Sequence, residues 1–310
     1  MRTLAVAAAV VLLAGTPAPA ATIEVTSAED GGAGTLRDAI ERANEAPGST
    51  ITIPHGRDLV IVVNSALPQI RADGTTVRGG GATLREGEAC ERPGHKKGCS
   101  GLVVAASDVT IRDLHVAGFL FDGISVHGED ASDVRIEDVQ AIGNRDDGIG
   151  ISDGAGPVTV EHCLLMGNGF RTKGKGVLVF SDAKAVVRDS VAIGNRDGVT
   201  VTRGSNATLE NVVIAASYDK GLGASAASIQ GDDLAILANG RDPENPAPNA
   251  DGVRVGLGGR IDLRRSLVAG NGDNGVVVLD TSTITLDHCR LESNHGGATS
   301  VAPAAHLEQR

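Results

Sequence analysis

Apolar residues alternate with polar ones in short runs that return at a nearly fixed interval along this chain. The segments DVRIEDVQAIGN, PVTVEHCLLMGN, KAVVRDSVAIGN and RIDLRRSLVAGN are four of eight similar copies between residues 107 and 296. Each unit has three alternating runs separated by glycine or polar corners, as at 134–136, 139–142 and 149–151. Alternation predicts strands, and self-similarity predicts a repeat architecture. The pattern therefore predicts a solenoid with three strands in each coil.

The interval between copies predicts that the coils stack in register. In each unit an apolar or small residue follows a polar pair, and successive copies of this residue lie 22 to 32 residues apart. These positions are Leu114, Val139, Cys163, Ser190, Val212, Leu234, Ser266 and Cys289. Strands of neighbouring coils would pair in parallel at about 4.8 Å, with inward side chains in rows along the axis. The runs TITIP, LVIVV and TTVRGGGATL predict further coils ahead of residue 107.

Asparagine recurs at one corner of most units. Asparagine tolerates the left-handed backbone conformation, and its amide can bond to the asparagine of the next coil. We expect a structural ladder at these positions, which are Asn144, Asn168, Asn195, Asn239, Asn271 and Asn294. The polar pair of each unit would form a solvated edge of the solenoid.

The segment before the repeats predicts one short helix. Thr35 can act as the N-cap of a helix, with Asp38 three residues after it. Leu36, Ile40 and Ala43 would share one apolar face of that helix. We expect a helix near residues 35–46 that covers the open end of the solenoid, which otherwise exposes core and a strand edge. This N-terminal cap would span residues 22–50.

The repeat consists of a strand pair, an asparagine, and then a DGI sequence that opens the next strand. It resembles that of the right-handed parallel β-helix proteins of the pectate-lyase-like superfamily. The resemblance covers nearly all of the mature chain. The stretch Leu36-Arg37-Asp38-Ala39-Ile40 is similar to the Leu-Arg-Glu-Ala-Ile-like motif of secreted bacterial β-helices. The resemblance implies an all-β, single-stranded right-handed parallel β-helix with an N-terminal capping helix. Catalytic and non-catalytic members share this fold.

The N-terminal residues predict where the protein is located, and the composition limits the ligands it can bind. Residues 1–20 combine a basic start, the apolar run LAVAAAVVLLAG and the small residues TPAPA, which predicts a secretory signal peptide. A single domain over 21–310 would follow, soluble and monomeric, either extracellular or periplasmic and without membrane insertion.

A net charge of −11 disfavours binding of nucleic acid. An aromatic content of 2% disfavours binding of neutral sugars, because these stack on flat apolar side chains.

The four cysteines divide into two kinds. In the sequence CERPGHKKGC, Cys90 and Cys99 close a polar loop within residues 85–100, and export favours a disulfide between them. Cys163 and Cys289 share one inward repeat position five coils apart, roughly 24 Å, which exceeds the reach of a disulfide. We expect both to be buried free thiols.

Two insertions at the same corner predict a cleft. Three or four steps usually separate the corner asparagine from the strand glycine, but eight separate Asn168 from Gly176 and thirteen separate Asn239 from Gly252. The two longer corners would form walls on either side of two uninserted coils. The expected floor is Arg196, Asp197, Tyr218, Asp219 and Lys220.

Such a floor favours lyase-like chemistry on an extracellular acidic polysaccharide. Lys220 or Tyr218 would remove a proton beside a uronate carboxylate, and Arg196 would neutralise the enolate-like charge. Asp197 and Asp219 would hold Ca²⁺. We expect substrate binding by Arg171, Lys173, Lys175 and Asp147.

Two alternatives stay open. Asp147, Asp197 and Asp219 lie on neighbouring coils at spacings that also suit glycoside hydrolysis, which requires two carboxylates about 5 to 9.5 Å apart. The second alternative is a non-catalytic surface or matrix module that binds a glycan. In that case these charged residues would only be solvated side chains at the corners of the coils. Measuring turnover after replacing Lys220 and Arg196 separates the enzyme from the binding module.

Overall fold

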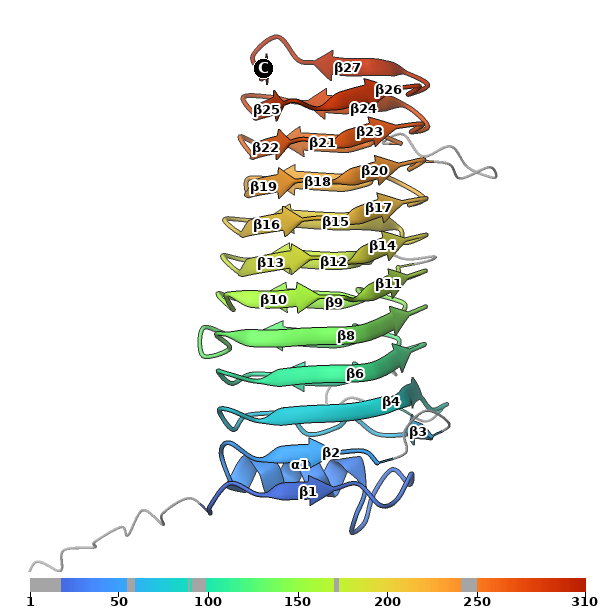
Figure 1. Ribbon diagram of the computed structural model, residues 1–310, viewed down its shortest axis with the longest axis vertical. Coiled ribbons are helices and arrows are strands. Elements are labelled where there is room, and N and C mark those ends of the chain that lie inside the picture. The colour runs from blue at the N-terminus through green and yellow to red at the C-terminus, as the bar shows by residue number, and fades with distance from the viewer. Residues whose placement is uncertain (1–17, 55–58, 89, 91–98, 170–172, 241–249) are drawn as a thin grey trace, which may run out of the picture.

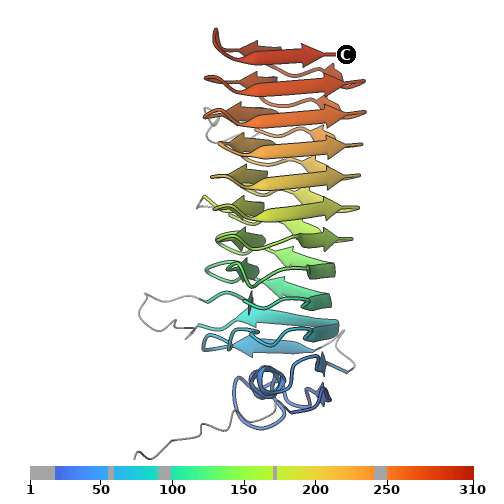
Figure 2. The same ribbon diagram turned by 90° about the vertical axis from the view of Figure 1, so that its left-hand side faces the viewer.

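The computed structural model describes residues 18–54, 59–88, 90, 99–169, 173–240 and 250–310. Short strands wind about one long axis in a stack of coils, with the helix α1 (Leu36–Glu45) at the N-terminal end and β27 (Gly297–Val301) at the other (Figure 1). Viewed from the side, the strands of successive coils lie in flat parallel layers (Figure 2). The all-β solenoid predicted from the repeat is confirmed.

The strands form two sheets, and every strand pair recorded between coils is parallel. The larger sheet contains β1 (Thr22–Glu24), β2 (Thr50–Thr52), β3 (Val60–Val63), β4 (Thr76–Glu86), β6 (Thr110–Ala117), β8 (Val134–Ile142), β10 (Val158–Glu161), β11 (Leu164–Met166), β13 (Lys184–Arg188), β14 (Val191–Ile193), β16 (Asn206–Glu210), β17 (Val213–Ala215), β19 (Ser228–Asp232), β20 (Ala235–Leu237), β22 (Arg260–Arg264), β23 (Leu267–Ala269), β25 (Thr283–Asp287), β26 (Arg290–Glu292) and β28 (His306–Gln309).

The smaller sheet covers the remaining side of the coil. It contains β5 (Leu102–Val104), β7 (Ile124–His127), β9 (Ile149–Ser152), β12 (Lys175–Phe180), β15 (Asp197–Thr202), β18 (Leu222–Ser225), β21 (Val253–Gly256), β24 (Asn274–Val278) and β27. From β9 to β26 each coil contributes one strand to this sheet and two short strands to the larger one, and the last coil contributes β27 and β28. In β4, β6 and β8 those two strands are joined into one longer strand.

Register follows from the alternation seen in the sequence. Val160 of β10 pairs with Ile136 on the preceding coil and with Val187 on the next, and all three are buried. A shift of one residue would turn this apolar row to solvent, so the buried rows fix the register of every coil. The core is therefore built from Val, Ile, Leu and Ala in stacked rows rather than from aromatic side chains.

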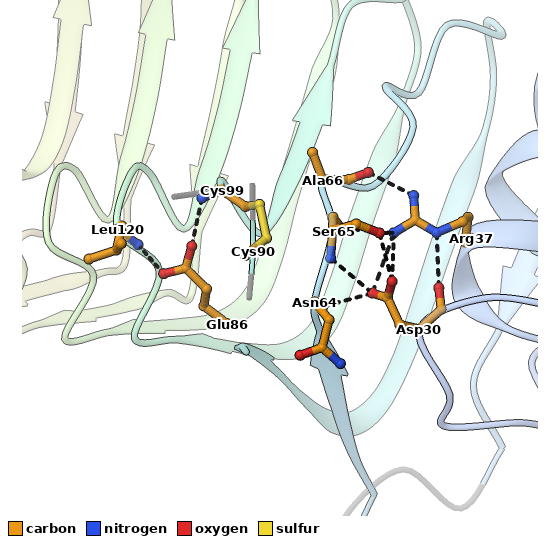
Figure 3. Close-up of a disulfide and its surroundings, with 9 residues drawn as sticks. All are labelled: Asp30, Arg37, Asn64, Ser65, Ala66, Glu86, Cys90, Cys99 and Leu120. Carbon is orange, nitrogen blue, oxygen red and sulfur yellow. Dashed lines mark hydrogen bonds and ion pairs between the residues drawn. A yellow bond between two sulfur atoms is a disulfide. The ribbon is translucent and has the colours of Figure 1, made fainter. Parts of the chain in front are cut away.

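The helix α1 lies where the sequence predicted a helix. Thr35 is its N-cap, and the Thr35 Oγ1 atom accepts a hydrogen bond from the Asp38 backbone N–H at 3.2 Å. Its buried residues are Leu36, Ala39, Ile40 and Ala43. Arg37 donates to the backbone oxygens of Asp30 and Ala66 (Figure 3). Arg37 thus ties the helix to the loops beside it.

The predicted disulfide between Cys90 and Cys99 is present, with their Cα atoms 5.9 Å apart. Beside it, Glu86 at the end of β4 accepts hydrogen bonds from the backbone N–H groups of Cys99 at 2.6 Å and Leu120 at 2.7 Å (Figure 3). Burial raises the pKa of the Glu86 carboxyl, and the two backbone bonds oppose that rise. Glu86 thus links the end of β4 to Cys99 and to the segment after β6.

The corner asparagines form the predicted ladder, which is divided into two parts. The Asn144 Nδ2 group donates to Asn168 Oδ1 at 3.0 Å, and the Asn168 Nδ2 group donates to Asn195 Oδ1 at 3.0 Å. A second run continues through Asn239, Asn271 and Asn294. Ser217 occupies the corner between the two runs, and its backbone N–H donates to Asn239 Oδ1.

One cysteine prediction needs correction. Cys163 and Cys289 are free thiols as expected, and Cys163 is buried, but Cys289 is only half-buried. Cys289 precedes β26 near the C-terminal end of the stack, where Leu291 and Leu307 are also only partly buried. A single neighbouring coil covers these side chains less completely than two do.

The predicted boundaries are described in part. Residues 1–17 of the expected signal peptide lie outside the described residues, and the division into a signal peptide and one domain over 21–310 stays a prediction. Among the helices that the structure describes, none is long and apolar enough to cross a membrane.

Candidate functional site

A groove of about 750 Å³ lies over the outer face of the smaller sheet. It extends from β12 across β15 and β18 to β21, and the segment after β24 closes it. Its described cations are Lys173, Lys175, Arg196, Arg203, Lys220 and Arg254. Its described carboxylates are Asp197, Asp219 and Asp280. Six cations against three carboxylates give this groove a positive surplus on a chain whose net charge is −11.

The register explains why the sheet is hollowed at this place. One outward row runs from Leu178 through Thr200 and Gly223 to Arg254, and the next runs from Phe180 through Thr202 and Ser225 to Gly256. In the first row small side chains lie between strands that carry larger ones, and in the second row the side chains become smaller from Phe180 to Gly256. The hollow therefore arises from residues on four successive coils and belongs to no single repeat.

The deepest charges of the groove form an ion pair. The Lys220 Nζ atom lies 2.7 Å from Asp197 Oδ2 on the preceding coil, and Asp197 is 6% exposed. The side chain of Lys220 lies across the backbone of Gly223, because a Cβ atom at that glycine would come within 2.6 Å of Lys220 Cε. The second carboxylate oxygen of Asp197, Oδ1, is buried without a protein hydrogen-bond partner.

Asp219 lies next to this pair. Arg196 reaches Asp219 with its Nη2 atom at 3.7 Å from Oδ2, and Asp219 Oδ1 is buried without a protein hydrogen-bond partner. Burial raises the pKa of Asp219, the Asp197 charge raises it further, and Lys220 and Arg196 act in the opposite direction. Two carboxylates and the cations that balance them thus share one corner of the groove.

The sequence analysis missed Arg254 and Arg203. Arg254 donates from Nε to Asp251 Oδ2 at 2.7 Å, and Asp251 is fully buried at the start of β21. The guanidinium of Arg203 lies over the ring of Phe180 with its Cζ atom 4.8 Å from the centroid. Only corner residues were considered as candidates. For Arg254 the available signal was its outward position within β21, and for Arg203 its place directly after β15.

The residues predicted to form the site are only partly brought together. Lys173, Lys175, Arg196, Asp197, Asp219 and Lys220 line the groove. Tyr218 is half-buried outside the groove lining, with its backbone N–H donating to Asn195 O. The groove lies on the face of the sheet, and the expected cleft between the inserted corners stays a prediction. Arg171 and residues 241–249 lie outside the described residues.

Asp147 is placed beneath the site and does not line the groove. Its Oδ1 atom accepts a hydrogen bond from the Lys175 backbone N–H at 2.7 Å, and Asp147 is 4% exposed. Burial raises the pKa of Asp147 well above its usual range, the Asp122 charge adds to the rise, and the charge on Lys175 opposes it. Asp147 thus holds the corner that presents Lys175.

The corner does not fit Ca²⁺, which takes six to eight oxygen ligands. Asp197 and Asp219 offer two unpartnered carboxylate oxygens, but each carboxylate already has a cation beside it. Within the described residues, the sets of three metal-ligating side chains are Glu86 with Cys90 and Cys99, and Glu161 with His162 and Asp189. The Ca²⁺ prediction stays untested, and we derive no step through the ion.

A family model described as "Right handed beta helix region" matches residues 42–192 and 170–308. The chain therefore belongs to the right-handed β-helix family. A search by sequence found no match among curated proteins.

Solved structures with a similar fold include an alginate lyase, an alginate epimerase and a pectate lyase. An alginate lyase from Paenibacillus aligns with a TM-score of 0.60 and 16% identity, covering 94% of this chain and 98% of that one. The periplasmic alginate epimerase AlgG aligns at 0.54 and 12%, covering 93% and 82%. A pectate lyase aligns at 0.54 and 14%, covering 93% and 78%. These identities establish a shared fold.

Proposed function

We propose that this protein binds an acidic polysaccharide along the cationic groove of the smaller sheet, outside the cytoplasm and as a monomer. The surplus of cations in the groove is the observation that carries the proposal, because the chain as a whole would repel a polyanion. Alginate and pectate, named in the structures with a similar fold, are polymers of uronic acids. The disulfide agrees with an oxidising compartment.

The charged corner supports binding more directly than proton abstraction. The Lys220 Nζ atom lies 2.7 Å from Asp197 Oδ2, and this ion pair engages the atom that would have to accept a proton. Tyr218, the other base predicted from the sequence, does not line the groove. We therefore assign Lys220 and Arg196 to the binding of uronate carboxylates. Lyase-like turnover, hydrolysis by paired aspartates and non-catalytic binding are separated by assaying unsaturated ends and reducing ends after incubation with polymer.

The binding proposal is tested with variants of two groove cations, the half-buried Lys175 and the exposed Arg203. Lys175→Ala and Arg203→Gln should each weaken binding of alginate or pectate oligosaccharides about two- to fivefold, the typical range for a partly solvated charge pair. The matched control is Arg260→Gln, because Arg260 pairs with Asp262 on the larger sheet, away from the groove. Calorimetric titration at two salt concentrations measures both effects.

Salt should weaken the interaction, because mobile ions screen exposed charges. Adding a chelator should leave the affinity unchanged, since the proposed contacts use protein cations alone. Equal losses for Arg260→Gln and the groove variants would overturn the placement of the site. Loss of binding with the chelator would instead restore the Ca²⁺ hypothesis for Asp197 and Asp219.

A further inference from the structure

The groove carries apolar surface that carboxylate binding does not require. Leu257, in the turn after β21, is 70% exposed, and Leu279, after β24, lines the same end of the groove. Exposed large apolar side chains are few on the described surface, and the others, Val60, Met166 and Val301, are exposed to a smaller degree. Apolar side chains placed beside cations suit a ligand that is anionic and also carries an apolar group.

Gly256 opens a recess between these leucines. It occupies the outward row of Phe180 and Ser225, where other coils carry a side chain. A Cβ atom placed at Gly256 would have Leu279 Cβ, Leu279 Cδ1 and Asp280 Oδ2 as its nearest neighbours, each at 3.8 Å. Its φ angle lies outside the left-handed region, so the backbone does not require glycine here. The missing side chain therefore leaves space that a small group can fill.

A cation lies on the same strand as this recess. Arg254 precedes Gly256 by two residues on β21 and faces the same side of the sheet, which separates their Cα atoms by about 6.6 Å. Its contact with the buried Asp251 holds the guanidinium in place. Arg254 and the residues of the recess line the same groove, so one anionic ligand can contact both.

We infer that the recess formed by Gly256, Leu257 and Leu279 binds an acetyl group esterified to a hydroxyl of a uronate whose carboxylate contacts Arg254. This inference rests on the proposed function and makes it more specific. An acetyl ester leaves the uronate carboxylate charged, whereas a methyl ester would remove the charge that Arg254 pairs with. The ligand class is therefore an O-acetylated acidic polysaccharide.

The test compares two forms of one polymer. O-acetylated alginate oligosaccharides, and the same preparation after mild alkaline deacetylation, are titrated into the full chain by calorimetry. The wild-type protein should bind the acetylated form about three- to fivefold more tightly, as expected for burial of one methyl group. In Gly256→Val the valine side chain fills the recess, so the ratio of the two affinities should fall to one or below.

Two further variants keep the result interpretable. Leu257→Asn removes the exposed leucine and suits the left-handed backbone at that position, where φ is 53°, so it should fold and also lower the ratio. Ser152→Val changes the same outward row on β9, outside the groove lining, and should keep the wild-type ratio.

The possible failures are distinguishable. Equal wild-type affinity for the two forms overturns the acetyl site while leaving the proposed function in place. Absence of binding to both forms overturns the proposed function and the acetyl site with it. A wild-type ratio that persists in both Gly256→Val and Leu257→Asn would show that the acetyl group is recognised elsewhere in the groove.

Discussion

Asp147, at the corner before β9, shows how burial changes the pKa of a carboxyl group in this protein. Asp147 is nearly inaccessible to solvent, and its Oδ1 atom holds the backbone N–H of Lys175. Because its pKa is raised in the folded state, the folded chain retains the proton to higher pH than the unfolded chain does. Stability from this group is fully present below the unfolded value near 3.9 and is lost as the pH rises through the folded pKa.

Asp147→Asn should therefore stabilise the protein at pH 7. The amide oxygen keeps the bond to Lys175, no charge needs to be buried, and Asn274 already occupies the same row on another coil. The gain over wild type should shrink as the pH falls towards 4, where the wild-type carboxyl becomes protonated in both states. Urea unfolding at pH 4, 5.5 and 7 measures this trend, with Asp130→Asn in an exposed turn as the control.

A gain that did not change with pH would contradict the role assigned to burial. It would show instead that the amide makes a better hydrogen bond at this corner. The raised pKa of Asp219 arises in the same way, from desolvation and a neighbouring carboxylate. Asp219 differs because Arg196 reaches it, so a substitution there would also alter the groove.

Among the elements, α1 closes the N-terminal end of the core. Ile40 is fully buried on the face that α1 turns to the coils, while Glu41 beside it is exposed. Ile40→Ala should lower the free energy of unfolding by about 2–5 kcal/mol, because it removes buried methylene groups and leaves a cavity. Glu41→Ala should change it by less than about 0.5 kcal/mol, as expected for an exposed surface position. Denaturant unfolding followed by circular dichroism compares the two variants.

Similar losses for Ile40→Ala and Glu41→Ala would mean that the coils do not depend on α1. The helix could then be detached without affecting the solenoid. The contacts of Arg37 with the backbone oxygens of Asp30 and Ala66 argue for attachment, because they connect α1 to the loops beside it. The resemblance of this segment to a capping motif stays an interpretation, whereas its buried face is a structural observation.

In the whole molecule, each coil contacts chiefly its neighbours, so local stability depends on position along the axis. Cys163 lies within the stack and Cys289 near its C-terminal end. Burial raises the pKa of the Cys163 thiol to about 12 and also raises that of the half-buried Cys289. A thiol reagent at pH 8 should label Cys289 in the native protein through opening of the last coils. Cys163 should be labelled only on global unfolding.

Single-thiol variants make this test unambiguous. Cys289→Ser leaves Cys163 as the free thiol, Cys163→Ala leaves Cys289, and the bonded pair Cys90–Cys99 does not react. Mass spectrometry of timed samples gives the two labelling rates. Equal rates for the two thiols would show that the coils open together and that the end of the stack is no weaker than its middle.

Much of the architecture could be predicted because it repeats. Alternation fixed which side chains face inward, and the corner asparagines and the Thr35 cap were readable because each acts through its own local conformation. Ser217 was missed as the gap between two asparagine runs, since a serine at one corner differs little from ordinary variation. Cys289 was wrongly expected to be buried because its repeat position was known but the cover over the last coils was not.

By itself, the sequence determined the strands, their register, the disulfide loop and the charges at the inserted corners, because these depend on neighbours in the chain or on one repeated interval. Only the tertiary structure decided the groove. Its depth depends on the sizes of Phe180, Ser225 and Gly256 at once, and these lie on different coils. Arg254 and Leu257 became part of a site only when stacking placed them beside those positions, since distance across coils is set by parallel pairing and not by separation along the chain.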